Sequence, residues 1–307
     1  MLSLPPEPGL HRLLSPHDIR AIAVRGAEPG PTLLVSAGVH GDEYEGVRAI
    51  FETVEALDPR ALRGTLLTVP ILNYPAHRAV ERNHPADGGN LARQFPGRAD
   101  GSPSERLAYA FDTEFLPLAD FYLDLHSGGI RFAMPSMAGY EADDPRGRAA
   151  AEVFGAPVIW GHPVIEPGRT ISSARARGIP FLYTEARGAG RIHPDDLRMM
   201  RRGILNLMRH LGMLDGAPEI PAPPLRLHGI GNTDDGVFAT ADGFWMPSVA
   251  LLEAVRAGQP IGRIVDETGE TIAVPTAPAD GIVGLLRELP PVSAGDVLIL
   301  VATPEES

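Results

Sequence analysis

Short apolar runs alternate with longer amphipathic stretches over the first two thirds of the chain. In residues 44–57, Val47, Ile50 and Val54 recur at the spacing of one helix face. The same period predicts further helices over residues 104–115, 146–154 and 194–214, and apolar runs predict strands over residues 19–24, 32–36, 64–72, 121–125, 156–160 and 179–184. We expect the first two strands to pair as neighbours, because only a Gly/Pro turn separates them. Strands that alternate with helices are typical of an α/β fold with a mostly parallel, mixed sheet and helices on both faces.

The pattern changes after residue 215. Residues 216–224 are rich in proline, which neither a helix nor a central strand tolerates. We therefore predict a catalytic α/β domain over residues 1–215, a linker over 216–224 and a second domain over 225–307.

The second predicted domain contains an internal repeat. Ala241-Asp-Gly recurs as Ala279-Asp-Gly, and Val255-Arg-Ala-Gly recurs as Val292-Ser-Ala-Gly. Two short strand-turn-strand units cannot each bury a hydrophobic face alone, so we expect them to intertwine into a small all-β barrel or sandwich. This arrangement resembles the barrel-sandwich fold of lipoyl and biotinyl domains.

The composition excludes several chemistries. The chain has no cysteine, and all 27 of its basic residues are arginine. Thiolate nucleophiles, disulfides, cysteine zinc sites, Schiff-base catalysis and a swinging-arm carrier role are therefore excluded. A net charge of −12 makes nucleic acid an unexpected partner. No apolar run approaches the ~20 residues of a membrane span and no signal-peptide pattern opens the chain, so we expect a cytoplasmic protein with no membrane partner.

Polar residues follow three of the expected strands. His40 and Glu43 come after residues 32–36 at a spacing of i, i+3, His126 follows residues 121–125, and Glu185 follows residues 179–184. Carboxyl ends of parallel strands meet at one edge of a sheet, so these groups can converge. Two histidines and one carboxylate form the ligand set of a catalytic zinc site with a fourth position for water, and Glu185 is left to act as general base. The alternative for His40 and Glu43 is a turn with a solvated glutamate.

Two neighbouring groups have open roles. Asp124 precedes His126 by two residues on the same strand face, where it either orients an imidazole or is a buried acid bonded to backbone amides. His162 follows another expected strand and is either a further site residue or a hydrogen-bonded wall residue.

A long segment rich in glycine, proline and arginine lies between the strand that ends at residue 72 and the helix that begins at residue 104. Its arginines are Arg78, Arg82, Arg93 and Arg98. A loop of this length is either functional or disordered.

Four motifs in this order carry a resemblance. They are Gly38-Val-His40-Gly-Asp-Glu43, then Arg82 with Asn90-Leu-Ala92-Arg93-Gln-Phe-Pro-Gly97, then Asp124-Leu-His126-Ser-Gly, then Thr184-Glu185. As a set, and together with the expected C-terminal barrel, they resemble the succinylglutamate desuccinylase/aspartoacylase family of zinc deacylases, which are relatives of zinc carboxypeptidases. The resemblance implies a zinc carboxypeptidase-like fold and one Zn2+ per chain, bound by His40, Glu43 and His126. It further implies that Glu185 is the base, that Arg82 polarises the scissile carbonyl and that Arg93 binds a substrate carboxylate.

The chain departs from the family pattern at one position. Ala92 stands where the pattern has asparagine, so one donor for a carboxylate is missing. Asn90 is a further candidate for the substrate site, although it lies two residues earlier. Arg175, ten residues before Glu185, is a candidate for a second carboxylate-binding arginine, and Arg177 competes for that role.

The sequence therefore predicts a zinc-dependent amidohydrolase that removes the acyl group from a small, anionic N-acylated amino acid or amine. A zinc carboxypeptidase that acts on a peptide C-terminus is one alternative, and a non-catalytic metal- or ligand-binding relative is another. We expect a homo-oligomer.

Overall fold

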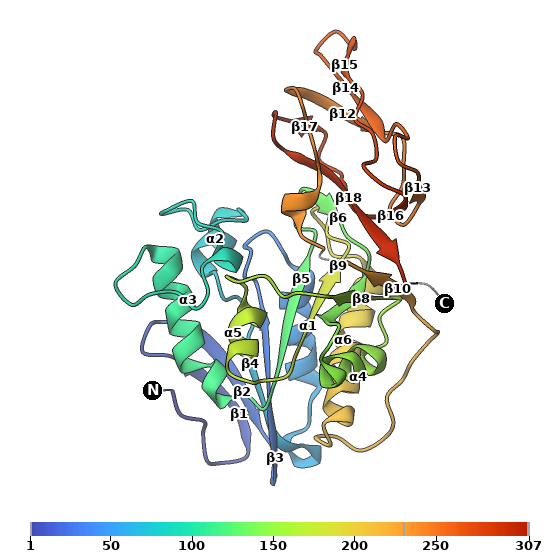
Figure 1. The fold of residues 1–307 in the computed structure, drawn as a ribbon. Helices are drawn as coiled ribbons and strands as arrows, with labels where there is room; N and C mark the ends of the chain where they lie inside the picture. Colours follow the sequence, from blue (N-terminus) through green and yellow to red (C-terminus); the bar gives the residue numbers. More distant parts are fainter. Residues whose placement is uncertain (1, 230, 306–307) are drawn as a thin grey trace.

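The computed structural model describes residues 2–229 and 231–305, and its centre is a twisted mixed sheet with helices on both faces (Figure 1). Along the α/β part, the strand order is β1-β2-β4-β3-β5-β9-β7-β8. The strands are β1 Gly9–Leu14, β2 Arg20–Arg25, β3 Glu28–Ala37, β4 Arg63–Val69, β5 Phe121–Ser127, β7 Met137–Glu141, β8 Val158–His162 and β9 Phe181–Ala186. The central strands β4, β3, β5 and β9 are parallel, whereas β2 and β7 pair with this group in the antiparallel sense. The mixed, mostly parallel α/β sheet predicted from the sequence is confirmed.

The helices form two layers, each with its own apolar core. The α-helices are α1 Glu45–Ala56, α2 Tyr74–Ala79, α3 Pro103–Glu114, α4 Pro145–Phe154, α5 Thr170–Ala176 and α6 Pro194–His210. Helices α1, α4 and α6 pack against one face of the sheet, where Phe154 and Met200 are fully buried, and α3 and α5 cover the other face, where Phe111 and Tyr122 are fully buried. Short 3-10 turns η1 Pro59–Ala61, η2 Leu91–Arg93 and η3 Leu116–Leu118 complete this part.

Local sequence explains where helices begin. Ser102 caps α3 in a capping box with Glu105, and Pro103 occupies the first helical position, where the missing N–H costs nothing. Helix α6 also begins with a proline, Pro194, although no side chain caps it, and two aspartates in its first turn favour the positive end of the helix dipole. The predicted helices therefore form close to their expected bounds, although α6 ends at His210 rather than at residue 214.

The prediction that the first two expected strands are neighbours is wrong. Strand β3 pairs with β4 on one edge and β5 on the other, and β2 pairs with the far edge of β4. The Gly/Pro turn packs against the start of β4, where the Gly26 amide donates to Gly64 O at 2.8 Å. The backbone N–H and C=O groups on both edges of the buried strand β3 are thus hydrogen-bonded to parallel strands, and β2 pairs with the remaining edge of β4.

The C-terminal strands continue the large sheet. We call residues 225–305 the C-terminal β region, which holds η4 Thr233–Asp235 and the strands β10 Leu225–His228, β11 Val237–Phe238, β12 Gly243–Pro247, β13 Ala254–Val255, β14 Gly262–Val265, β15 Thr271–Ala273, β16 Gly281–Arg287, β17 Pro291–Val292 and β18 Val297–Pro304. Strand β10 pairs in parallel with β8, and β18, β16 and β13 follow it in the sheet. Strand pairing therefore crosses the proline-rich segment 216–224, and the division into two domains stays a prediction.

The two sequence repeats pair crosswise. Strand β12 of the first repeat pairs with β17 of the second, and β13 of the first pairs with β16 of the second. Strands β15, β14, β12 and β17 form a separate small sheet. Trp245, 1% exposed, lies in the apolar core between these strands. This pairing is consistent with the expected intertwining, and assignment to the barrel-sandwich class stays a prediction.

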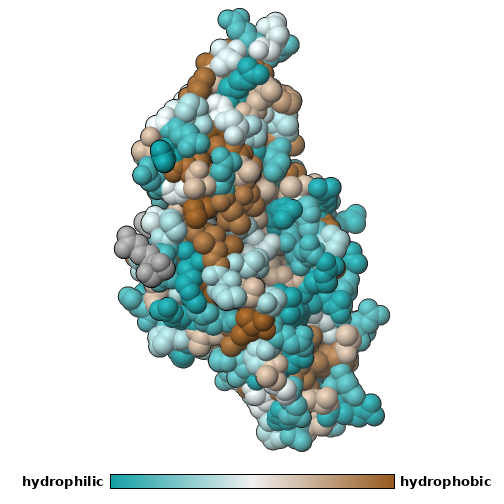
Figure 2. All heavy atoms as spheres, turned by 90° about the vertical axis from the view of Figure 1, so that its right-hand side faces the viewer, coloured by the Kyte–Doolittle hydropathy of each residue, from teal (hydrophilic) through white to brown (hydrophobic). Residues whose placement is uncertain are grey.

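Apolar side chains also reach the surface. Figure 2 shows a band of apolar residues on one face, at mid-height and above, bordered by hydrophilic residues. Within the described residues, no helix is both long and apolar enough to cross a membrane.

Candidate metal centre and active site

His40 and Glu43 lie on the loop that follows β3. The chain leaves the strand through Gly38, whose φ of +63° is in the left-handed region that glycine favours. Gly41 then packs against the backbone of α2, where a Cβ would lie 2.1 Å from the carbonyl carbon of Ala76. The two glycines of the motif therefore allow the tight path that presents His40 and Glu43 at the carboxyl end of the sheet.

His126 and Glu185 lie on adjacent parallel strands. They are register partners on β5 and β9. Asp124, two residues before His126 on β5, is the register partner of Ser36 on β3. The sheet therefore brings together the groups that the sequence placed after three separate strands.

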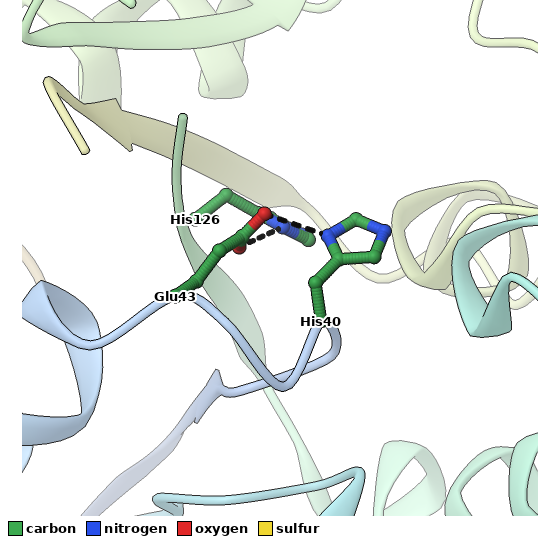
Figure 3. A group of neighbouring side chains, drawn as sticks. All are labelled: His40, Glu43 and His126. Carbon is green, nitrogen blue, oxygen red and sulfur yellow. Dashed lines mark hydrogen bonds and ion pairs between the residues drawn. The ribbon is translucent and has the colours of Figure 1, made fainter. Parts of the chain in front are cut away.

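The carboxylate of Glu43 lies between the two imidazoles (Figure 3). His40 Nδ1 lies 2.8 Å from Glu43 Oε1, and His126 Nδ1 lies 3.0 Å from Glu43 Oε2. Each of the three residues offers one ligand atom, and these atoms lie within 4.8 Å of one another. Glu43 also accepts hydrogen bonds from the Ser127 amide at 3.2 Å and from Arg82 Nη1 at 3.0 Å.

The outer nitrogen of each ring is held by an oxygen acceptor. His40 Nε2 lies 3.0 Å from Asn90 Oδ1, and His126 Nε2 lies 3.0 Å from Asp124 Oδ2. An oxygen acceptor at this distance favours a proton on Nε2 of each ring. The other nitrogen, Nδ1, can then offer its lone pair to a cation once any proton on Nδ1 is released. Two nitrogens and one carboxylate oxygen form a donor set that fits zinc.

Electrostatics keep Glu43 and His126 ionised but not His40, whose pKa is lowered by burial and by the charge of Arg82. Burial alone would raise the pKa of the Glu43 carboxyl, but His40 and His126 outweigh it and hold that pKa well below its usual range. Burial would lower the pKa of His126, yet the charges of Asp124 and Glu43 raise it well above its usual value. A proton therefore occupies the position between His126 and Glu43 that a divalent cation can take.

Asp124 contacts His126 and two hydroxyl groups. Its Oδ1 accepts from Ser36 Oγ at 2.6 Å, and its Oδ2 also accepts from the Thr170 hydroxyl. The side chain is 1% exposed. The bonds of this buried acid run to an imidazole and to side-chain hydroxyls, which supports the role of orienting His126.

Glu185 stands apart from the ligand cluster with one unused oxygen. Its Oε2 is buried and has no hydrogen-bond partner within the described part of the chain. Burial raises the pKa of Glu185 to about 8. A carboxyl group in this state can take up and release a proton near neutral pH.

These side chains line one cavity of ≈ 560 Å³, with walls from both the α/β part and the C-terminal β region. His40, Arg82, Asn90, Arg93, His126 and Glu185 all contribute to the wall. His162 lines it as well, with Nε2 2.6 Å from the Tyr183 hydroxyl and its ring stacked on Trp160. His162 therefore has the contacts of a hydrogen-bonded wall residue.

The structure does not bring Arg175 to this cavity. The Arg175 side chain is 55% exposed, and its Nε lies 2.8 Å from Glu141 Oε1. Its competitor Arg177 pairs with Asp112. The residues that the sequence analysis missed are Arg169 and Asn232, which line the cavity and contact one another.

Known proteins resemble this chain over nearly its whole length. Residues 29–211 match the family model of the succinylglutamate desuccinylase/aspartoacylase catalytic domain. The N-alpha-acetyl-L-2,4-diaminobutyric acid deacetylase of Halomonas elongata is 35% identical over 286 residues, which cover 91% of this chain and 84% of that protein.

Solved structures give the same picture. A succinylglutamate desuccinylase/aspartoacylase from Rhodobacter sphaeroides matches with a TM-score of 0.85 and 30% identity, over 98% of this chain and 96% of that one. The product-bound ectoine utilization protein EutE (DoeB) from Ruegeria pomeroyi matches with a TM-score of 0.88 and 28% identity, over 98% of each chain.

Proposed function

Because the chain belongs to the succinylglutamate desuccinylase/aspartoacylase family, we propose that it is a zinc-dependent deacylase that hydrolyses the amide bond of a small N-acylated amino acid or amine. The observation that carries the proposal is the cluster of His40, Glu43 and His126 beside a carboxylate, Glu185, that holds no ligand position. A protein that only binds metal needs no such additional base. The deacetylase from Halomonas elongata supports hydrolysis of an N-acyl bond.

In this proposal, His40, Glu43 and His126 hold one Zn2+ per chain. Zinc in such a site would act as a Lewis acid, lowering the pKa of water to about 7 and polarising a carbonyl group. The Asn90 and Asp124 oxygens keep both imidazoles oriented through their Nε2 atoms.

Glu185 and Arg82 would carry the proton and charge transfers. Glu185 takes a proton from the attacking water on its unused Oε2 and later gives it to the leaving amine. Arg82 donates to Glu43 through Nη1, which leaves further guanidinium donors for the oxygen on which negative charge develops.

The form of the cavity favours small substrates over peptides. Asn232, Asp234 and Arg287 of the C-terminal β region form part of its wall. A cavity of ≈ 560 Å³ walled in this way suits a small N-acyl compound, so we consider a carboxypeptidase activity the weaker candidate.

A substrate panel tests the proposal. Zinc-loaded protein is assayed with N-acetyl, N-succinyl and N-formyl amino acids, with Nα-acetyl-L-2,4-diaminobutyrate, and with dipeptides and longer peptides. We expect release of a free amine from at least one N-acyl compound and much slower cleavage of peptides. Faster cleavage of peptides would favour the carboxypeptidase, and zinc-loaded protein that is inactive on the whole panel would favour a non-catalytic relative.

A further inference from the structure

Three carboxylates of one short segment are buried, and the candidate metal cluster accounts for one of them. Asp42, Glu43 and Glu45 are 3%, 3% and 1% exposed. Glu43 belongs to the cluster, whereas Asp42 and Glu45 have no part in the proposed chemistry. A carboxylate leaves water at a large cost unless hydrogen bonds replace its hydration. The hydrogen bonds that Asp42 and Glu45 accept therefore indicate what each of them holds in place.

Glu45 is the first residue of α1 and contacts the chain beyond β9. Its Oε1 accepts from the Gly188 amide at 3.0 Å, and Gly188 follows Glu185 by three residues. Its Oε2 accepts from the Tyr44 amide at 3.3 Å, next to Glu43 in the chain. Glu45 therefore connects the loop of one proposed metal ligand with the segment that follows the proposed base.

Glu45 also contacts the end of β5 through Ser127. Burial raises the pKa of the Glu45 carboxyl, and a hydrogen bond from the Ser127 side chain lowers it in part. Ser127 directly follows His126, and its amide donates to Glu43 Oε2 at 3.2 Å. The ends of β5 and β9, two strands that carry site residues, are thus both bonded to this one buried carboxylate.

Asp42 holds the loop that follows β5. Its Oδ2 accepts from the Ile130 amide at 3.2 Å. Gly129 passes so close that a Cβ there would lie 2.6 Å from Asp42 Oδ2, and its φ of +61° is in the left-handed region. The Gly190 amide donates to Gly129 O at 2.9 Å, which joins this loop to the loop after β9. The two acids on either side of Glu43 therefore hold the same pair of loops.

We propose that Glu45 is a positioning residue, which holds the ends of β5 and β9 against the loop of Glu43 and thereby sets the place of Glu185 relative to the proposed metal ligands. Asp42 assists through the loop after β5. The proposal rests on the proposed deacylase function, because it needs both the metal site and the base. Groups that support the ligands of a metal change metal affinity or activity by about 10–100-fold when they are replaced.

The test replaces Glu45 and compares the result with the loss of a buried acid outside the site. Glu45→Ala removes the carboxylate, and Glu45→Gln keeps its shape and one oxygen for the Gly188 amide. Glu114→Ala is the matched control, since Glu114 is 5% exposed, pairs with His17 and does not line the cavity. Each protein is measured for zinc Kd by competition with a chelator, for kcat and KM with the best N-acyl substrate, and for Tm without ligand.

Glu45→Ala should bind zinc about 10–100-fold more weakly than wild type and should lose kcat by a similar factor. Its KM should stay nearly unchanged, because Glu45 does not line the cavity. Glu45→Gln should keep kcat within about threefold of wild type, since it loses at most one hydrogen bond. Glu114→Ala should lower Tm but leave zinc Kd and kcat unchanged. Should Glu45→Ala not fold, Glu45→Asp, which draws the carboxylate back by one methylene group, should show the same losses.

Unchanged zinc Kd and kcat in a folded Glu45→Ala or Glu45→Asp would overturn the positioning role. A loss of kcat in Glu45→Gln as large as in Glu45→Ala would overturn it as well, because the effect would then belong to the charge. So would a weaker zinc Kd in Glu114→Ala that matches its loss of Tm, because both effects would then follow from stability alone.

Two outcomes separate this role from the proposed function. A wild type that binds zinc and hydrolyses no compound of the panel would contradict the proposed function alone, and the zinc Kd of the Glu45 variants would then decide the positioning role. A wild type that binds no zinc would contradict both.

Discussion

Replacement of Glu185 by glutamine removes the proposed base and leaves the shape of the side chain intact. Its Oε2 is buried without a hydrogen-bond partner among the described residues, so the exchange breaks no contact at that atom. Glutamine cannot take a proton from water at neutral pH. Since general base catalysis contributes about 10²–10⁴-fold, kcat should fall by that factor, which corresponds to roughly 3–5 kcal/mol in the barrier.

The assay measures kcat, KM and zinc content of zinc-loaded Glu185→Gln with the best N-acyl substrate of the panel. KM and zinc content should stay close to those of wild type, because Glu185 is outside the proposed ligand set of His40, Glu43 and His126. Glu152→Gln is the matched control, since Glu152 on α4 pairs with Arg226 and does not line the cavity. A kcat of Glu185→Gln within about threefold of wild type, at full zinc content, would refute the assignment of the base.

Three further predictions concern charge at and near the site. Arg82→Ala should lower kcat/KM by about 10²–10³-fold in steady-state assays, as loss of an oxyanion donor does in other enzymes, and the reasoning fails if only KM changes. Asp87→Ala should lower the free energy of unfolding at pH 7 by about 2 kcal/mol in urea titrations, because the Asp87 carboxylate accepts from the Ser104 amide and hydroxyl at 2.8 Å. Since these bonds hold the pKa of Asp87 below its usual range, the loss of stability should vanish in strong acid, and an equal loss at all pH values would contradict this reasoning. In metal-free protein, burial raises the pKa of Glu185 to about 8, so this carboxyl group makes wild type less stable as the pH rises from about 4.3 to 8. The free energy of unfolding of Glu185→Gln should therefore rise relative to that of wild type over this interval, and a difference between the two proteins that does not change with pH would contradict the raised pKa.

The sequence could predict that His40, Glu43, His126 and Glu185 lie close together, because their positions depend on local order, and their roles stay a prediction. His126 and Glu185 directly follow apolar runs, and parallel pairing of β5 and β9 makes them register partners. The family resemblance, which rested on four motifs, is confirmed by the match over residues 29–211.

Other features depend on packing between distant segments. Arg175 was chosen by its distance in sequence from Glu185, but α5 turns by about 100° per residue, and six residues separate Arg175 from the cavity-facing Arg169. Asn232 reaches Arg169 from the C-terminal β region, a contact for which the sequence has no periodic signal. The two-residue strands β6 Phe132–Ala133, β11, β13 and β17 are likewise too short to leave a pattern.

The insertion of β4 between β2 and β3 has the same origin. A short Gly/Pro turn predicts neighbouring strands, and only the hydrogen bonding of the complete sheet shows that β3 takes both of its partners from parallel strands.

In the proposed function, hydrolysis of the N-acyl compound requires a zinc ion held by His40, Glu43 and His126. The most direct measurement is the rate of hydrolysis of the best panel substrate during titration of chelator-treated protein with zinc, with His126→Ala in parallel. We expect negligible activity without metal, full activity at about one zinc per chain, and neither tight zinc binding nor activity in His126→Ala. Full activity of protein shown to be free of metal would contradict this requirement.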